Sequence, residues 1–385
     1  MSETQPAARP VEGGLDQPTE PHRTRMEQFW RLFQKNRMAV IGLVIFGVFF
    51  LTAMAGLVLT SGTEPAFDPA QIRLAEKLRP PFSSINREVL TPAEVPKLPV
   101  YIFGTDDLGR DVFARMLQGA WVSLTVGFVA VGISVIIGIF MGGIAGYFGQ
   151  RPIRLHQITA AAAPISPPAA AAAGWTGPAV FLGAVAAALS VLSMRRRRPP
   201  AHLRWMDHGV ITVDTLIMRL VDIMLCFPSF FLILTVVALL PASLYNIMIV
   251  IGLTSWMGTT RFVRAEFLSL REQDFVLAAR ALGVDNLRII FRHMIPNAIA
   301  PVLVSATIGI ATAILTEAGL SFLGFGVPPP HATWGNILSD GRRFIFDAPW
   351  LTFVPGVAIL IVVLSFNLFG EGLRDALNPK LRRRG

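Results

Sequence analysis

Long runs of apolar residues are the feature that most limits the folds open to this chain. Five of them extend over about 20 residues, the length that a helix needs to cross the hydrocarbon core of a bilayer. They occupy residues 38–60, 121–147, 220–240, 298–323 and 351–369. A sixth run, 247–260, reaches that length only if it continues to Phe262. Because backbone groups in lipid must be hydrogen-bonded internally, we predict an all-α polytopic membrane protein with six core transmembrane helices.

The distribution of charge predicts how these spans are oriented. Only 15% of the residues are charged, whereas soluble domains carry about a quarter. Basic residues concentrate in the N-terminal arm, the connector 148–219, the loop 261–297 and the C-terminal tail. By the positive-inside rule we expect both termini in the cytoplasm. The net charge of +9 then reflects topology and contact with membrane lipid, and we expect no nucleic-acid partner.

Runs and loops together divide the chain into consecutive segments. These are a cytoplasmic N-terminal arm with an interfacial helix (1–37), the first span (38–60), a periplasmic loop (61–118), the second span (119–147), an atypical insertion rich in Ala, Pro and Arg (148–212) and a core that holds the third to sixth spans (213–382). In the arm, Phe29, Trp30 and Phe33 recur at helical spacing beside basic residues. This pattern is typical of an amphipathic helix at the membrane surface.

Residues 150–210 hold an apolar stretch with arginines on both sides. The part 174–194 is long enough to span the membrane, but one crossing would move the loop 261–297 to the opposite side. The basic clusters predict instead that both ends lie in the cytoplasm. A hairpin, a re-entrant segment and a surface-lying helix all satisfy this condition. We interpret the four arginines at 195–198 as an anchor at lipid headgroups rather than a nucleic-acid site.

Three aspartates precede the second span. The spacing of Asp106, Asp107 and Asp111 superficially resembles a metal-binding loop. Arg110 would compete for these carboxylates, and the full spacing of a calcium loop is absent. We therefore favour a helix cap, with Thr105 or Asp106 as the capping residue, over a metal site.

Residues for catalysis do not form a recognisable pattern. The phosphate-binding pattern G-x-x-x-x-G-K-[ST] is absent, so the chain alone is not expected to hydrolyse ATP. No Cys/His spacing suited to a metal occurs, and the six histidines form no triad with a nucleophile. We predict no catalytic residue, no bound metal and no cofactor. The single cysteine, Cys226, lies in an apolar run and is interpreted as a small buried side chain.

Charged side chains inside the apolar runs are costly and therefore informative. Arg219 and Asp222 stand three residues apart, a spacing at which they can pair on one helix face. Glu317 lies in the fifth run. Two interpretations of Glu317 remain open: it lines a transport pathway, or it makes a structural hydrogen bond to a neighbouring helix.

A polar loop, 266–297, separates two of the apolar runs and carries several basic side chains, so it cannot lie in hydrocarbon. The helix formers that follow Asp274 end at Gly283, a position where a helix C-terminus favours a left-handed residue. Asp285 is placed to cap a second helix, which we expect to run to His293. The pattern predicts two short helices joined by a rigid break.

The same loop presents small residues and a proline. Ala278 and Ala279 would let another surface approach closely, and Pro296 ends the loop or opens the next span. We therefore predict a rigid projection on the cytoplasmic face that docks into a groove of a partner protein.

The loop LAARALGVDNLRIIFRHMIP resembles the signature of binding-protein-dependent ABC importer permeases, E-A-A-x3-G-x9-I-x-L-P. The matching positions are Ala278, Ala279, Gly283, Ile295 and Pro296.

Two positions depart from this signature: Leu277 stands where the family has Glu, and His293 where it has Ile. At both positions the chain resembles the dipeptide, oligopeptide and nickel branch of the family, which tolerates these departures. Three further stretches also resemble the C-type subunit of that branch: FGTDDLGRDVFARMLQGA, EAGLSFLGFGVPPPHATWG and GEGLRDALNPKLR. The resemblance covers about 39–149 and 213–382 and leaves the insertion without a counterpart.

This resemblance implies the architecture of a type I ABC importer permease with a coupling-helix loop at 266–297, located in the inner (plasma) membrane of a bacterial cell. It also implies partners: a second, homologous permease that forms a heterodimer, two ATP-binding subunits that hold ATP and Mg, and a periplasmic or extracellular solute-binding protein. The expected cargo is a dipeptide or oligopeptide, with nickel chelates or other small solutes as the alternative.

Two further hypotheses need no ATPase-driven transport. A secondary transporter or channel would more often show repeated halves with broken helices at the midplane, and no such repeat is apparent. A membrane anchor would hold a partner through the loop while nothing crosses. The docking loop favours the ATP-driven permease over both.

Overall fold

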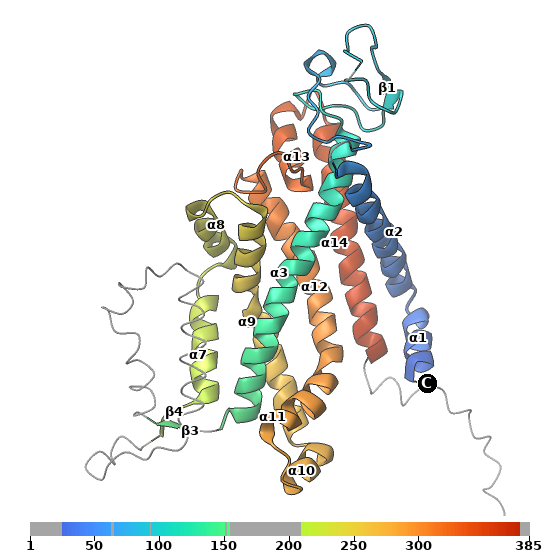
Figure 1. Ribbon diagram of the computed structural model, residues 1–385. Coiled ribbons are helices and arrows are strands. Elements are labelled where there is room, and N and C mark those ends of the chain that lie inside the picture. Colours follow the sequence, from blue (N-terminus) through green and yellow to red (C-terminus); the bar gives the residue numbers. More distant parts are fainter. Residues whose placement is uncertain (1–24, 63–64, 93, 151, 155–208, 378–385) are drawn as a thin grey trace, which may run out of the picture.

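The body of the protein is a bundle of long helices (Figure 1), seen in a computed structural model that describes residues 25–62, 65–92, 94–150, 152–154 and 209–377. The long helices are α2 (Arg37–Thr60), α3 (Val112–Phe148), α9 (Leu244–Arg271), α12 (Ile295–Phe322) and α14 (Trp350–Leu377). Helix α3 is central, because it packs against α9, α2 and α12. The prediction of a helical protein with several spans is confirmed.

Four helical stretches among the described residues are long and apolar enough to cross a membrane. They are α2, α3, α14 and the continuous stretch Asn286–Phe322. The bent pair α7 (Val213–Leu225) and α8 (Ser229–Leu239) adds a fifth if it is taken as one span. Helix α9 has sufficient length at 28 residues but a more polar sequence. The count of six spans therefore stays a prediction.

The third predicted span is not one straight helix. Helices α7 and α8 meet at an angle of 79°, so the run 220–240 is not one continuous helix, and its crossing of the membrane as one span stays a prediction. Pro228 explains the break, because its ring removes a backbone donor and disfavours helical geometry at Phe227. Cys226 is exposed at this bend, so its interpretation as a buried side chain is wrong.

Glycines allow α3 and α9 to pack closely. Gly138, Gly142 and Gly146 recur every fourth residue along α3. A Cβ atom added at any of them would lie within 2.6 Å of an atom of α9. Small residues at this spacing let two helix backbones approach, which is a main source of helix association in lipid.

The chain between α2 and α3 forms a cap at one end of the bundle (Figure 1). It contains η1 (Leu74–Glu76) and the antiparallel strands β1 (Ser83–Ser84) and β2 (Val100–Tyr101). Helix α13 (Trp334–Gly341) lies at the same end and is followed by η5 (Arg342–Phe344).

The first turn of α3 is capped by a different aspartate from the one predicted. Asp111 is the N-cap residue, and its carboxylate accepts a hydrogen bond from the backbone N–H of Phe113 at 2.9 Å. The prediction of Thr105 or Asp106 as the cap is wrong, because both side chains are already bonded elsewhere. The hydroxyl of Thr105 donates to the carbonyl of Glu76 at 2.5 Å.

Asp106 is the centre of a buried ion-pair network, which we call the cap network. Its carboxylate accepts hydrogen bonds from Arg110 Nε at 2.7 Å and from Arg115 Nη1 at 2.6 Å. It also accepts from the backbone N–H groups of Leu108 and Arg110, at 3.0 and 2.8 Å. Arg115 extends the network to Asp340 of α13 through Nη2 at 2.9 Å. The cap is thereby tied to both α3 and α13.

Helix α1 (Arg25–Lys35) confirms the helical pattern of the N-terminal arm. Its aromatic residues do not share one environment. Phe33 is buried and contacts the ring of Phe369 on α14 at a centroid distance of 6.0 Å, whereas Trp30 is about half exposed. Part of the predicted membrane-facing surface therefore packs on the protein itself.

The insertion begins and ends at one place. Strand β3 (Pro152–Arg154) pairs antiparallel with β4 (Gly209–Thr212), and Pro152 lies opposite Thr212. The two ends of the intervening segment thus lie side by side, and their place on the cytoplasmic side stays a prediction. The segment itself, including Ser166 and His202, lies outside the described residues.

We expect cysteine labels at Ser166 and His202 to react from the cytoplasmic side only. The measurement is labelling with a membrane-impermeant maleimide in right-side-out and inverted vesicles. The exposed Cys226 must first be replaced by serine, and that variant is the control. Reaction of His202 from the outside would show that the insertion crosses the membrane.

Candidate functional site

The loop after α9 forms two helices joined by a fixed break, as predicted. Helix α10 (Asp274–Ala281) is terminated two residues later by Gly283, whose φ of 74° is left-handed. The N–H of Gly283 donates to the carbonyl of Arg280, and that of Val284 donates to the carbonyl of Ala279, both at 3.1 Å. This pair of bonds is the glycine-dependent helix termination known as the Schellman motif.

The second helix has the predicted cap but not the predicted end. Asp285 accepts a hydrogen bond from the N–H of Leu287 at 3.0 Å and starts α11 (Asn286–Ile289). The chain then continues through the π-helical turn η4 (Ile290–Met294) into α12. The expected stop near His293 is therefore wrong.

Pro296 explains the π-helical turn. Its ring would clash with the carbonyl four residues before it in a regular α-helix, and it has no N–H to donate. A wider turn accommodates this, and the N–H of Ile295 donates to Ile290, five residues back. Helix α11 and the candidate span α12 thus form one continuous helical stretch, Asn286–Phe322.

One face of the loop is anchored in the bundle. Val276, Ile289 and Met294 are completely buried, in a cluster that also contains Phe267 of α9. Ala279 is buried as well, so of the two alanines only the exposed Ala278 is accessible to a partner.

The opposite face of the loop is open to a partner. Leu282 is 84% exposed and Leu287 is 60% exposed. Asp274 and Pro296 are exposed, and His293 and Ile295 are partly exposed. The side of the loop that faces away from the bundle is thus accessible, which the predicted contact with a partner requires.

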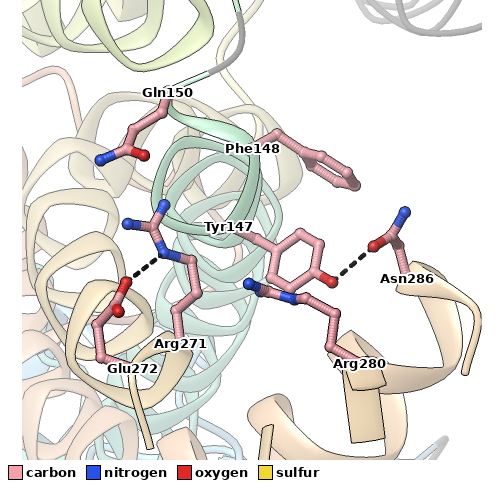
Figure 2. A pocket seen from close by; sticks show the side chains of 7 residues that line it. All are labelled: Tyr147, Phe148, Gln150, Arg271, Glu272, Arg280 and Asn286. Carbon is pink, nitrogen blue, oxygen red and sulfur yellow. Dashed lines mark hydrogen bonds and ion pairs between the residues drawn. The ribbon is translucent and has the colours of Figure 1, made fainter. Parts of the chain in front are cut away.

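A cleft of about 390 Å³ lies between this loop and the ends of α3 and α9. Figure 2 shows Tyr147 of α3 reaching toward the loop. Its hydroxyl donates to Asn286 Oδ1 at 2.7 Å, and the guanidinium of Arg280 lies over its ring, 5.4 Å from the centroid. Tyr147 therefore joins both α10 and α11 to the central helix of the bundle.

The sequence did not identify Tyr147 or Arg280 as site residues. A usable signal was present, since the chain has only 3 tyrosines and one of them ends an apolar run. That signal does not reveal its partners, because Tyr147 and Asn286 lie 139 positions apart.

The predicted ion pair between Arg219 and Asp222 is not the one formed. Asp222 Oδ1 accepts from Arg261 Nη2 of α9 at 2.6 Å, and Arg219 is exposed. Asp214 similarly pairs with Arg264 of α9. These contacts hold α7 against α9, because the packing of two helices places arginine opposite each carboxylate.

Glu317 is completely buried within this chain. Its Oε1 accepts a hydrogen bond from Ser321 at 2.6 Å, and the hydroxyls of Ser321 and Thr333 lie 3.3 Å apart. Ser321 lies on the same helix as Glu317, and no hydrogen bond among the described residues reaches the buried Oε2 of Glu317. Both interpretations of Glu317 therefore stay open.

A helical membrane protein whose polar loop is built into its spans has the architecture of the membrane subunit of a transport system. Comparison with known proteins shows the family. Residues 209–383 match the family described as "Binding-protein-dependent transport system inner membrane component". Residues 24–81 match the "N-terminal TM domain of oligopeptide transport permease C".

Curated relatives match over nearly the whole chain. The dipeptide transport system permease protein DppC of Alkalihalophilus pseudofirmus is 36% identical over 353 residues, which cover 92% of this chain and 89% of the relative. The oligopeptide permease OppC of Bacillus subtilis is 32% identical, with 91% and 88% covered. DppC of Haemophilus influenzae is also 32% identical, with 94% and 97% covered. The chain belongs to this family of type I importer permeases.

Proposed function

We propose that this chain is the permease subunit of an ATP-driven importer of dipeptides or oligopeptides. The observation that carries the proposal is the loop from Asp274 to Met294, which is rigid, anchored on one face and open on the other. The relatives described as dipeptide and oligopeptide permeases support the cargo.

ATP hydrolysis belongs to two separate ATP-binding subunits in this proposal, which hold the ATP and Mg. One of them grips the exposed face of α10. A second, homologous permease completes the pathway, and a solute-binding protein delivers the peptide at the opposite end, beside the cap and α13. Both termini of this chain then lie in the cytoplasm.

The geometry supplies a route for the motion. An ATPase that pushes α10 also moves α11, and α11 is continuous with α12 through the π-helical turn. Tyr147 passes the same displacement to α3. Spans that tilt as rigid bodies can alternate the side to which the pathway opens.

The test is reconstitution of both permeases with their ATPases and binding protein in proteoliposomes. We expect uptake of a labelled dipeptide or oligopeptide that requires ATP. Uptake at the same rate without nucleotide would identify a channel or a secondary transporter instead. Uptake of a nickel chelate in preference to peptides would keep the mechanism but correct the cargo.

Replacement of Gly283 by valine is expected to uncouple ATP hydrolysis from uptake. No atom lies within 4 Å of an added Cβ, so the cost is backbone strain alone, about 1–2 kcal/mol for a side chain in a left-handed position. Gly283→Asn is the matched control, since asparagine tolerates this conformation, and Gly283→Asp should fall between them. The measurement is peptide transported per ATP hydrolysed. An unchanged ratio in Gly283→Val would contradict the assignment of the loop.

A further inference from the structure

The cleft beside α10 has a charge pattern that the proposed docking of α10 does not explain. Among the residues that line it, Arg271 and Arg280 are cationic and Glu272 is the single carboxylate. Gln150 and Asn286 add amide groups at its edge (Figure 2). The lining therefore offers more hydrogen-bond donors than acceptors and carries a positive charge in excess.

Arg280 is held in position without being neutralised. Its guanidinium stacks over the ring of Tyr147, and the hydrogen bond from Tyr147 to Asn286 fixes that ring. In the described part of the chain no carboxylate pairs with Arg280. A stacked guanidinium keeps its N–H edge free, and this edge matches the two oxygens of a carboxylate.

Arg271 supplies a second donor group to the same cleft. Its side chain is 13% exposed, and its Nε pairs with Glu272 at 3.0 Å. The hydrogen bonds found among the described residues use only this nitrogen. In Figure 2 its two terminal amino groups point toward the side of the cleft that holds Gln150.

We propose that this cleft receives an acidic side chain of the ATPase subunit that docks on α10. The inference rests on the proposed function and specifies the chemistry of that partner. Arg280 of α10 and Asn286 of α11 both line the cleft, so a subunit seated on α10 would lie next to it. Burial of the carboxylate between two guanidinium groups gives a charge-assisted, two-point contact.

Charge on the rest of the loop agrees with an acidic partner surface. Arg288 and Arg292 are exposed on the second docking helix and the turn that follows it. The volume of about 390 Å³ exceeds that of one carboxylate group, so the cleft accommodates an acidic residue together with part of its backbone. Acidic residues on the ATPase would therefore set the orientation of the docked subunit as well as its affinity.

The experiment measures the affinity of the purified ATPase subunit for the full permease heterodimer in detergent. Arg280→Glu is expected to raise Kd at least about 30-fold, as for loss of one partner of a buried charge pair. Arg280→Gln should raise it less and guards against misfolding of the reversed charge. Tyr147→Phe keeps the stacked ring but releases Asn286, so an intermediate loss is expected.

Arg374→Glu is the matched control, because Arg374 is an exposed arginine on α14 and does not line the cleft. Its Kd should change less than about threefold. A lysine substituted for one acidic residue on the ATPase docking surface should restore binding to Arg280→Glu. Full-strength binding of Arg280→Glu would overturn the inference and leave the proposed function intact.

Two other outcomes are distinguishable. If the unmodified permease binds no ATPase, the proposed function fails and the inference fails with it. The second outcome is that a lipid phosphate occupies the cleft. To test this, the binding titration is repeated in nanodiscs of phosphatidylcholine alone and with added phosphatidylglycerol. A loss in Arg280→Glu that appears only with phosphatidylglycerol would show that the cleft holds a lipid phosphate, which also overturns the inference.

Discussion

Asp106→Ala is expected to lower the free energy of unfolding by about 3–5 kcal/mol, the usual cost of removing one partner of a buried ion pair. Asp106 is completely buried and accepts four hydrogen bonds, from two arginine side chains and two backbone N–H groups. Its loss leaves Arg115, which is 3% exposed, with a buried charge that Asp340 only partly balances. The measurement is thermal unfolding in detergent, followed by tryptophan fluorescence.

Two related variants separate the parts of this effect. Asp106→Asn keeps an acceptor for the backbone N–H groups but removes the charge, so it should retain part of the stability. Asp340→Ala should cost about 1 kcal/mol or less, because the side chain of Asp340 is 36% exposed and partly screened by water. Equal losses in Asp106→Ala and Asp340→Ala would contradict the central place of Asp106.

Gly56→Ala is the second substitution with a large expected effect. A Cβ atom at Gly56 would lie 2.1 Å from the carbonyl oxygen of Leu117, so α2 and α3 would have to move apart. Overpacking of this kind costs about 1–3 kcal/mol or more. Because the obstructing atom belongs to the backbone, no side-chain rotation relieves the contact.

Gly47→Ala is the control on the same helix. No atom lies within 4 Å of an added Cβ at Gly47. Alanine is intrinsically the better helix former by about 1 kcal/mol, so this variant should be neutral or slightly stabilised. The difference in melting temperature between the two variants then isolates the helix contact. Similar melting temperatures would show that α2 and α3 do not pack as described.

The sequence predicted those features that depend on neighbouring residues. Apolar length located α2, α3, α12 and α14, because a bilayer imposes the same requirement on every spanning segment. Gly283 and Asp285 located the break in the docking loop, because left-handed backbone and helix capping are local demands. The break between the two short helices of the loop was therefore visible before any tertiary contact was known.

Features that depend on residues far apart in the chain were missed. The partner of Asp222 is Arg261, 39 positions away, and spacing along one helix suggested Arg219 instead. The cleft beside Arg280 lies where the end of α3, at Tyr147, contacts the loop. Local rules also do not distinguish the effects of two prolines. The third predicted span bends sharply at Pro228, whereas a π-helical turn accommodates Pro296 within a continuous helix.

The pairing of β3 with β4 has a consequence for how this chain can change its length. Once Pro152 and Thr212 are fixed opposite each other, a change in the number of residues between them costs little. Each doubling of that number raises the free energy of loop closure by about 0.6 kcal/mol. Sequence can be gained or lost there while α3 and α7 keep their order and direction. We therefore expect that a reporter domain can be inserted between β3 and β4 without changing the order or direction of the helices on either side.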